Sequence, residues 1–249
     1  MNDSVTALIL KQTDYREADA ILTVLTAEYG KLSFIAGGVR KMASKNAGSV
    51  LPFTEAQFQY DHKQGRTMFR LKTARTVQLF RKLHEDLDLS AAAGMVCEIA
   101  DLFCMQEEAE SSEEQYSLTR QALTLLNEGK DPCTVLFLYA SDMMGLFGIA
   151  ADVDECVRCF STTVSAVSAA EGGFLCADCA SLLNVPPSTP ARLRRFRLAV
   201  KGGLRQIRYT EEAGGMRLED LEILMEMIRL HTGMQIRSFS FFKRILSIE

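Results

Sequence analysis

The sequence is poor in the motifs on which most enzyme active sites depend. Only three of its 249 residues are histidine, and none of them stands in an H-E-x-x-H pattern. The G-x-S-x-G turn of serine hydrolases and the G-x-G-x-x-G loop of dinucleotide-binding proteins are missing, and Gly129-Lys130 is followed by Asp131, so it is not a P-loop. These absences favour a protein that is not an enzyme.

Long apolar runs are missing as well. The run from Val135 to Ala140 is closed by Asp142, far short of the roughly 20 residues that cross a bilayer. The first residues, Met-Asn-Asp-Ser, contain no basic region, and the apolar run from Val5 to Leu10 is too short for a signal peptide. We therefore expect a cytoplasmic protein that has no membrane partner.

The seven cysteines are an odd number, which disfavours a complete disulfide framework. Cys97 and Cys104, if both are helical, lie about 10 Å apart along one axis, which is too far for a disulfide. A reducing compartment fits these cysteines best.

Charge is distributed unevenly along the chain, although the net charge is only −4. Residues 1–80 carry 11 basic and 7 acidic side chains, and residues 181–249 carry 12 and 7. Residues 81–150, in contrast, carry 4 basic and 13 acidic side chains, and residues 151–180 carry 1 basic and 5 acidic side chains. A polyanion would therefore bind one of the two basic ends, although such patterns also occur on solvated faces without a ligand.

The first 80 residues have the pattern of short antiparallel strands. We predict strands at Val5 to Leu10, Ala20 to Thr26, Lys31 to Ala36, Phe53 to Tyr60 and Thr67 to Thr73. About five such strands in some 75 residues suggest a small barrel, of which the OB fold is the commonest nucleic-acid-binding type. The barrel aromatics could stack on bases, but alternation along the strands favours core packing for most of them.

Beyond Leu83 the hydrophobic period becomes helical. Asp131-Pro132 and Thr189-Pro190 have the form of helix starts, Gly202-Gly203 should interrupt a helix, and last helices are expected at about 218–230 and 238–247. The expected fold class is α+β: an N-terminal OB-like β-barrel followed by an α-helical domain with an inserted four-cysteine zinc-binding segment. The expected boundaries are 1–80 for the barrel, 81–150 and 183–249 for the helical domain, and 151–182 for the insert.

The insert contains two C-x-x-C pairs, Cys156 with Cys159 and Cys176 with Cys179, separated by 16 residues. This spacing is typical of zinc ribbons and knuckles, in which four thiolates close a tetrahedral shell around one structural Zn²⁺. Two redox pairs or two structural disulfides are the alternatives. A closed shell has no open position at which water could be activated, so the zinc would be structural.

The chain resembles the bacterial RecO family of recombination mediators, because its barrel, helical body and cysteine insert follow one another in the same order. The most specific stretches are YREAD at 15–19 and TAEYGKLSFIAGGVRK at 26–41, and a further match is CVRC at 156–159 with GGFLCADC at 172–179. Val39 and Lys41 depart from the family's G-A-R-R pattern but keep its basic character. Phe160 stands where the family usually has glycine, and the proline before the first cysteine is missing.

The resemblance implies binding of single- and double-stranded DNA, annealing of complementary strands and loading of RecA onto strands covered by single-strand-binding protein, with RecR as the working partner. For this chain we predict DNA contacts at Arg40, Lys41 and Lys45, in a glycine-flanked loop that leaves the third strand. Arg194 and Arg197, on a helix in the second basic end, are the alternative contact. A zinc-containing protein-protein adaptor that binds no nucleic acid is the alternative function.

Overall fold

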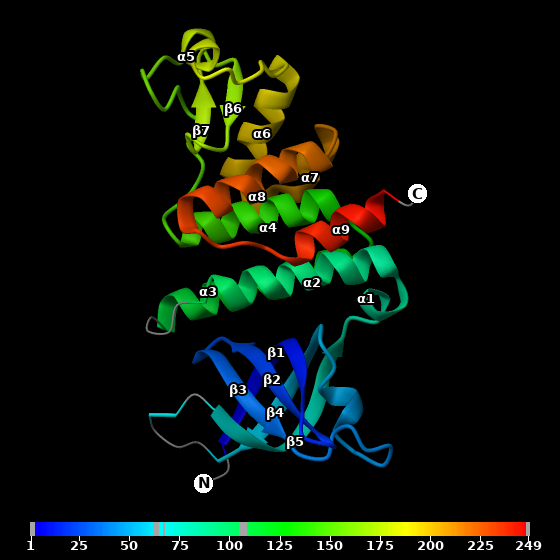
Figure 1. Cartoon of the computed structure of the whole chain (residues 1–249). Coiled ribbons are helices and arrows are strands. Elements are labelled where there is room, and N and C mark those ends of the chain that lie inside the picture. Colours follow the sequence, from blue (N-terminus) through cyan, green and yellow to red (C-terminus); the bar gives the residue numbers. More distant parts are fainter. Residues whose placement is uncertain (1–2, 62–64, 67, 105–108, 248–249) are drawn as a thin grey trace. The chain divides into compact units, whose positions relative to one another are not determined.

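The computed structural model describes residues 3–61, 65–66, 68–104 and 109–247, which fold into two compact units, Met1–Glu128 and Gly129–Glu249. The first unit contains a β-barrel and three helices, and the second contains the remaining helices and the cysteine-rich insert (Figure 1). This two-part division is coarser than the four segments expected from the sequence, whose boundaries stay a prediction.

The barrel of the first unit has five strands. In chain order they are β1 (Asp3–Tyr15), β2 (Asp19–Thr26), β3 (Gly30–Ala36), β4 (Thr54–Tyr60) and β5 (Met68–Leu79). The sheet closes in the order β1-β2-β3-β5-β4, and every neighbouring pair is antiparallel except the parallel pair of β3 with β5. The predicted strands and the α+β fold class are confirmed, although β1 and β5 are longer than expected.

Alternation along the strands directs the large apolar side chains into the barrel. The Phe34 ring lies edge-on to Phe58 and to Tyr60, with 5.1 Å between ring centroids in both pairs, and Phe69 packs 5.0 Å from Tyr60. All four side chains are buried. These four rings therefore form the core of the barrel and offer no stacking surface, as the strand alternation favoured for most of the aromatics.

Three helices complete the first unit: α1 (Lys82–Glu85), α2 (Leu87–Leu102) and α3 (Ala109–Glu128). Asp86 begins α2 as its N-cap, because its carboxylate accepts hydrogen bonds from the backbone N–H groups of Asp88 and Leu89. The buried Glu55 of β4 accepts a hydrogen bond from the Tyr116 hydroxyl at 2.6 Å and pairs with Arg120 at 2.9 Å. These two bonds attach α3 to the barrel.

The second unit consists mainly of helices. They are α4 (Pro132–Leu146), α5 (Ala177–Leu182), α6 (Pro190–Gly202), α7 (Ile207–Glu212), α8 (Leu218–Thr232) and α9 (Ser238–Leu246). Asp131 caps α4 and Thr189 caps α6, each with a proline as the first helical residue, as predicted. Within the described part of the chain, no helix combines the length and the apolar character that a bilayer crossing requires.

The predicted interruption at Gly202-Gly203 is also confirmed, and its cause is a close approach to α4. Gly203 has φ +54°, and a Cβ on it would lie 1.8 Å from a carboxylate oxygen of Asp142. The same carboxylate accepts a hydrogen bond from the backbone N–H of Leu204 at 2.8 Å. Only glycine fits here, because any side chain would displace the acceptor that fixes the turn.

The buried carboxylate of Asp220 connects α6 with α8. It pairs with Arg192 at 2.6 Å and with Arg195 at 3.0 Å, and it also accepts a hydrogen bond from the backbone N–H of Arg217 at 3.2 Å. The Asp220 side chain is 1% exposed, so both of its ion pairs are largely shielded from water. Removing the carboxylate would leave two arginines without a counter-charge in a dry contact.

We predict that Asp220→Ala lowers the free energy of unfolding by about 3–5 kcal/mol, as is usual when one partner of a buried ion pair is removed. Urea unfolding followed by circular dichroism measures this. Asp154→Ala is the matched control, since Asp154 also pairs with cations of α6 but is exposed, and it should leave stability nearly unchanged. Equal stability of the two variants would show that the Asp220 pairs do not hold the helices together.

Candidate metal centre and nucleic-acid interface

The insert folds around a short hairpin followed by a helical turn. Strands β6 (Ala166–Ser168) and β7 (Gly173–Leu175) pair antiparallel, and α5 begins directly after Cys176. Gly172, with φ +75°, lies in the turn between the two strands, and β7 leads into the second C-x-x-C pair. The first pair lies against the same hairpin, because the backbone N–H of Val157 donates to the carbonyl of Phe174 at 3.0 Å.

The four cysteines of the two pairs come together in space. The Sγ atoms of Cys156, Cys159, Cys176 and Cys179 all lie within 4.8 Å of one another, and those of Cys159 and Cys176 are 3.5 Å apart. Four sulfurs at about 2.3 Å from a central zinc ion would be roughly 3.8 Å from each other in a tetrahedron. The cluster therefore has the donor type, number and spacing of a closed zinc site.

Local hydrogen bonding favours negative charge at one sulfur of this cluster. Burial opposes ionisation of Cys156, but backbone hydrogen bonds at Cys176, Arg158 and Cys159 outweigh it and lower the pKa of the Cys156 thiol to about 6. The hydrogen bond with Cys176, together with burial and the other sulfurs, raises the pKa of Cys179 to about 12. Without a cation the four thiols cannot all ionise, whereas a divalent cation would favour the thiolate form of each.

Phe160, which stands where the family usually has glycine, follows directly after the first C-x-x-C pair. Phe160 has φ +61°, the left-handed conformation that glycine adopts easily, and its backbone N–H donates to the carbonyl of Cys156 at 2.8 Å. Its ring is largely exposed, so it contributes little packing. The turn is therefore kept without glycine, at the cost of local backbone strain.

The other cysteines have a different environment. Cys97 and Cys133 are buried in the helical parts, and burial raises the pKa of both thiols, to about 12 for Cys133. Such thiols stay protonated and behave as small apolar side chains. The described cysteines thus divide into buried core residues, the half-buried Cys104 and the four-sulfur cluster.

In the barrel, the loop that follows β3 is held by the turn between β1 and β2. The carboxylate of Asp19 accepts a hydrogen bond from the backbone N–H of Gly38 at 2.8 Å, and the carbonyl of Ala18 accepts one from Arg40 at 3.1 Å. Val39 is buried in the barrel core. The stretches 15–19 and 37–41, which carry the resemblance described above, therefore contact each other directly.

The three cations predicted in this loop have different surroundings. Arg40 forms an ion pair with Asp14 at 3.0 Å, which partly neutralises its charge. Lys41 and Lys45 are exposed and form no ion pair with any residue that the structure describes. The two lysines are thus available to an external anion, whereas Arg40 also helps to fix the loop.

A row of cations that the sequence analysis did not single out lies on β5. Met68, Arg70 and Lys72 point outward while Phe69 and Leu71 point into the barrel. The guanidinium of Arg70 lies over Gly37, at 3.6 Å from where a Cβ would be, and the Asn46 side chain bonds to the backbone of Lys72 and Ala74. These contacts bring the loop and its lysines beside β5. The alternation of cations at 70 and 72 in a strand was the signal that could have revealed them.

Beside this row the barrel surface has a hollow of about 560 Å³, lined by Asp61, Arg66, Met68, Phe69, Arg70, Leu71 and Lys72. Lys72 pairs with Asp61 at its edge. Arg66 and Arg70, and Arg75 further along β5, form no ion pair with described residues. Together with Lys41 and Lys45, these three arginines make up the five-residue cationic surface of the barrel.

The alternative contact on α6 is less uniform. Arg197 and Lys201 both bind the carboxylate of Asp154 in the insert, Arg197 at 2.9 Å. The Lys201 hydrogen bond and the two positive charges hold the pKa of Asp154 below its ordinary value, despite some desolvation. Arg194 is exposed and forms no ion pair within the described ranges. Of the two predicted residues on this helix, only Arg194 is therefore without a counter-charge.

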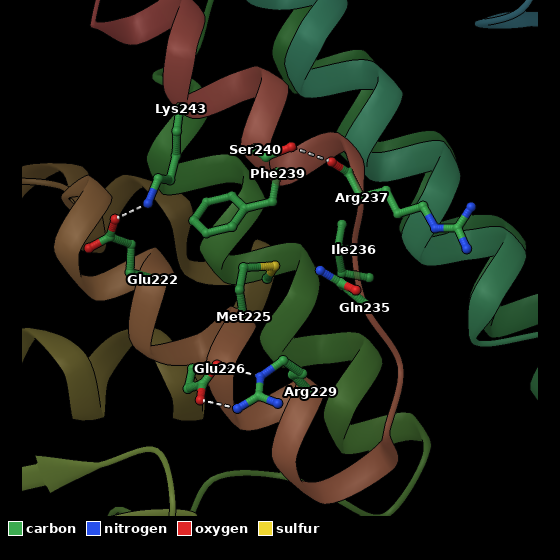
Figure 2. A pocket seen from close by; sticks show the side chains of 10 residues that line it. All are labelled: Glu222, Met225, Glu226, Arg229, Gln235, Ile236, Arg237, Phe239, Ser240 and Lys243. Atoms are coloured by element: carbon green, nitrogen blue, oxygen red, sulfur yellow. Dashed lines mark hydrogen bonds and ion pairs between the residues drawn. The ribbon is translucent and has the colours of Figure 1, made fainter.

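A groove of about 360 Å³ lies between α8 and α9 (Figure 2). Met225, Ile236 and Phe239 form its apolar part. Two of its cations are neutralised within the groove, Lys243 by Glu222 at 2.7 Å and Arg229 by Glu226 at 2.6 Å. These local pairs make the groove less suited to a phosphate backbone than the cationic surface of the barrel.

Comparison with known proteins accounts for nearly the whole chain. The family model described as "Recombination protein O N terminal" matches residues 1–80, and the one described as "Recombination protein O C terminal" matches residues 84–239. The DNA repair protein RecO of Bacillus pumilus (strain SAFR-032) is 28% identical over 244 residues, which cover 97% of this chain and 94% of that protein. The DNA repair protein RecO of Desulforudis audaxviator (strain MP104C) is 34% identical over 188 residues, or 75% and 73% of the two chains. The chain therefore belongs to the RecO family of DNA repair proteins.

Proposed function

We propose that this protein is a recombination mediator that binds single- and double-stranded DNA, anneals complementary strands and helps to load RecA onto strands covered by single-strand-binding protein. RecR is the proposed working partner. Membership of the family supports the role in DNA repair, and the finer steps are carried over from the resemblance. The protein would act in the cytoplasm, on the nucleoid when it is bound to DNA.

The observation that carries the proposal is the cationic surface of the barrel. Five cations without a counter-charge among the described residues lie on the loop after β3, on strand β5 and just before that strand, in a chain whose net charge is negative. Cations that release condensed counterions from phosphates supply most of the sequence-independent affinity for DNA. The adaptor alternative gives no reason for leaving these charges unpaired.

We further propose that the four-sulfur cluster holds one structural Zn²⁺. The insert has only a small apolar cluster of its own, to which two of the four cysteines, Cys156 and Cys176, themselves belong. Four thiolates leave no open position on the metal, so its contribution would be to stabilise the insert, by several kcal/mol. The proposal agrees with a protein that is not an enzyme, because a closed zinc shell cannot activate water.

The zinc proposal predicts about one tightly held zinc ion per chain, released slowly to chelators. In the Cys156→Ser and Cys176→Ser variants, residues 150–180 should unfold locally, because the remaining thiolates cannot hold the segment together. Metal analysis and amide hydrogen exchange measure the two effects. Cys104→Ser, outside the cluster, should keep its zinc; a metal-free wild type that is folded and fully active would remove the site.

The DNA proposal predicts that replacing Lys41, Lys45 and Arg70 together by alanine weakens binding to every sequence about equally. Three lost phosphate contacts should reduce the slope of log affinity against log salt by about 2 for a single strand, near 0.7 per contact. Stability should change little, because exposed cations contribute within about 0.5 kcal/mol each. Titration of labelled oligonucleotides at several salt concentrations measures both effects.

The matched comparison is the double variant Arg194→Ala with Arg197→Ala, which removes cations of α6 instead. We expect it to bind nearly like the wild type. If the α6 variant failed while the barrel variant bound and annealed normally, the DNA path would lie over the helical unit. If neither the wild type nor any variant bound DNA, the adaptor would be the better reading.

Annealing should require no nucleotide, because the sequence contains no phosphate-cradling motif. The rate at which the purified protein anneals complementary strands should therefore be the same with and without ATP and Mg²⁺. Fluorescence quenching between labelled complementary strands follows this rate. An ATPase activity that stays with the protein through purification, and on which annealing depends, would contradict the expectation.

A further inference from the structure

The four rings that fill the barrel are not accessible to a base. Phe34 and Phe58 are fully buried, and Tyr60 and Phe69 nearly so. Among the apolar side chains of the loop, one behaves differently: Met42 is 107% exposed, as open to solvent as in an extended peptide. It stands next to Lys41 and three residues before Lys45.

Met42 is held outward by a fixed turn. The backbone N–H of Lys41 donates to the carbonyl of Gly38 at 3.1 Å, and that of Ser44 donates to the carbonyl of Lys41 at 3.0 Å. At the start of this turn, Val39 is buried in the barrel core and the backbone N–H of Gly38 donates a hydrogen bond to the carboxylate of Asp19. The Met42 side chain therefore projects from an anchored loop and is not covered by any barrel residue that the structure describes.

We infer that Met42 is a base-contacting residue, whose side chain packs against or inserts between bases of a bound single strand while Lys41 and Lys45 bind the phosphates on either side. The inference rests on the proposed binding of DNA by the barrel and adds to it the residue that contacts bases. The occupant follows from charge complementarity: lysines without counter-charges select a polyanion, and a polyanion with apolar faces is a nucleic acid strand.

The chemistry of methionine suits this contact. Its unbranched, polarisable thioether adapts to flat aromatic surfaces without hydrogen bonds, so it tolerates any base. Apolar side chains are used in this way as wedges between base steps in other DNA-binding proteins. In a duplex such insertion must first unstack the bases, at a cost of a few kcal/mol per step that an unstacked single strand avoids, and so Met42 should favour single strands over duplex.

The test uses the full-length chain and three variants: Met42→Ala, Met42→Leu and Leu87→Ala. Leu87 is the matched control, an exposed apolar side chain between two carboxylates, Asp86 and Asp88. Each protein is titrated with labelled oligo(dT) and with a mixed-sequence duplex at several salt concentrations. Met42→Ala should bind the single strand roughly tenfold more weakly, as partial burial of this side chain implies.

Four further readouts decide between a base contact and a structural role. The salt slope of Met42→Ala should equal that of the wild type, because no counterion is involved. Its affinity for duplex should be nearly unchanged, Met42→Leu should restore most of the affinity for the single strand, and Leu87→Ala should bind like the wild type.

The inference and the proposed function fail in different ways. A wild type that binds no DNA overturns the proposed function, and the inference with it. A wild type that binds DNA while Met42→Ala binds oligo(dT) equally well overturns the inference alone. A Met42→Ala variant that loses affinity for both substrates and also shows a flatter salt slope overturns it too, because Met42 would then serve only to position the lysines.

Discussion

The parallel pairing of β3 with β5 is the constraint on which the surface of the barrel depends. It closes the sheet and places Ile35 opposite Arg70. Because β5 lies between β3 and β4 in the strand order, the connection from β3 to β4 must pass β5, and its Asn46 and Ser49 bond to that strand on the way. The loop lysines and the outward row of β5 become neighbours for this reason. Closure also fills the interior with rings, so only the outer surface and the loop can contact a ligand.

Charge counts alone cannot distinguish the two basic ends of the chain, since both have a clear excess of cations. The structure distinguishes them by their counter-charges. In the helical unit, Arg192 and Arg195 pair with Asp220, and Arg197 pairs with Asp154. These three arginines serve folding, by joining helices to each other and to the insert. In the barrel, Lys31, Arg40 and Lys72 are paired as well. The five residues of the cationic surface form no ion pair with the described residues, and a surface that keeps unpaired cations is the better candidate for phosphates.

Local signals in the sequence were sufficient for most of the fold. The strands follow from alternation, and the starts of α4 and α6 from Asp131-Pro132 and Thr189-Pro190, because caps and strand faces depend on neighbouring residues only. The cysteine cluster could be predicted from spacing alone. The full length of β5 could not, since its last residues are mostly exposed and their pairing with β4 is non-local. The contribution of Arg70 depends on barrel closure in the same way, and the pairing of Arg197 with Asp154 depends on where the insert folds.

The insert shows how a segment with little core can still be placed accurately. Its hairpin contacts the helices through Phe174, whose ring centroid lies 6.0 Å from that of Phe196. A hydrogen bond of 2.9 Å between His231 and the carbonyl of Ala169 adds a second contact. These contacts fix β6 and β7, which lead into the second C-x-x-C pair. The first pair is joined to the hairpin mainly by backbone bonds and by the sulfur cluster itself. A metal ion at the cluster would therefore act as the cross-link between the two halves of the insert, and through Asp154 it would also keep Arg197 and Lys201 of α6 neutralised. In this way the zinc site would make Arg197 and Lys201 less available to an external phosphate.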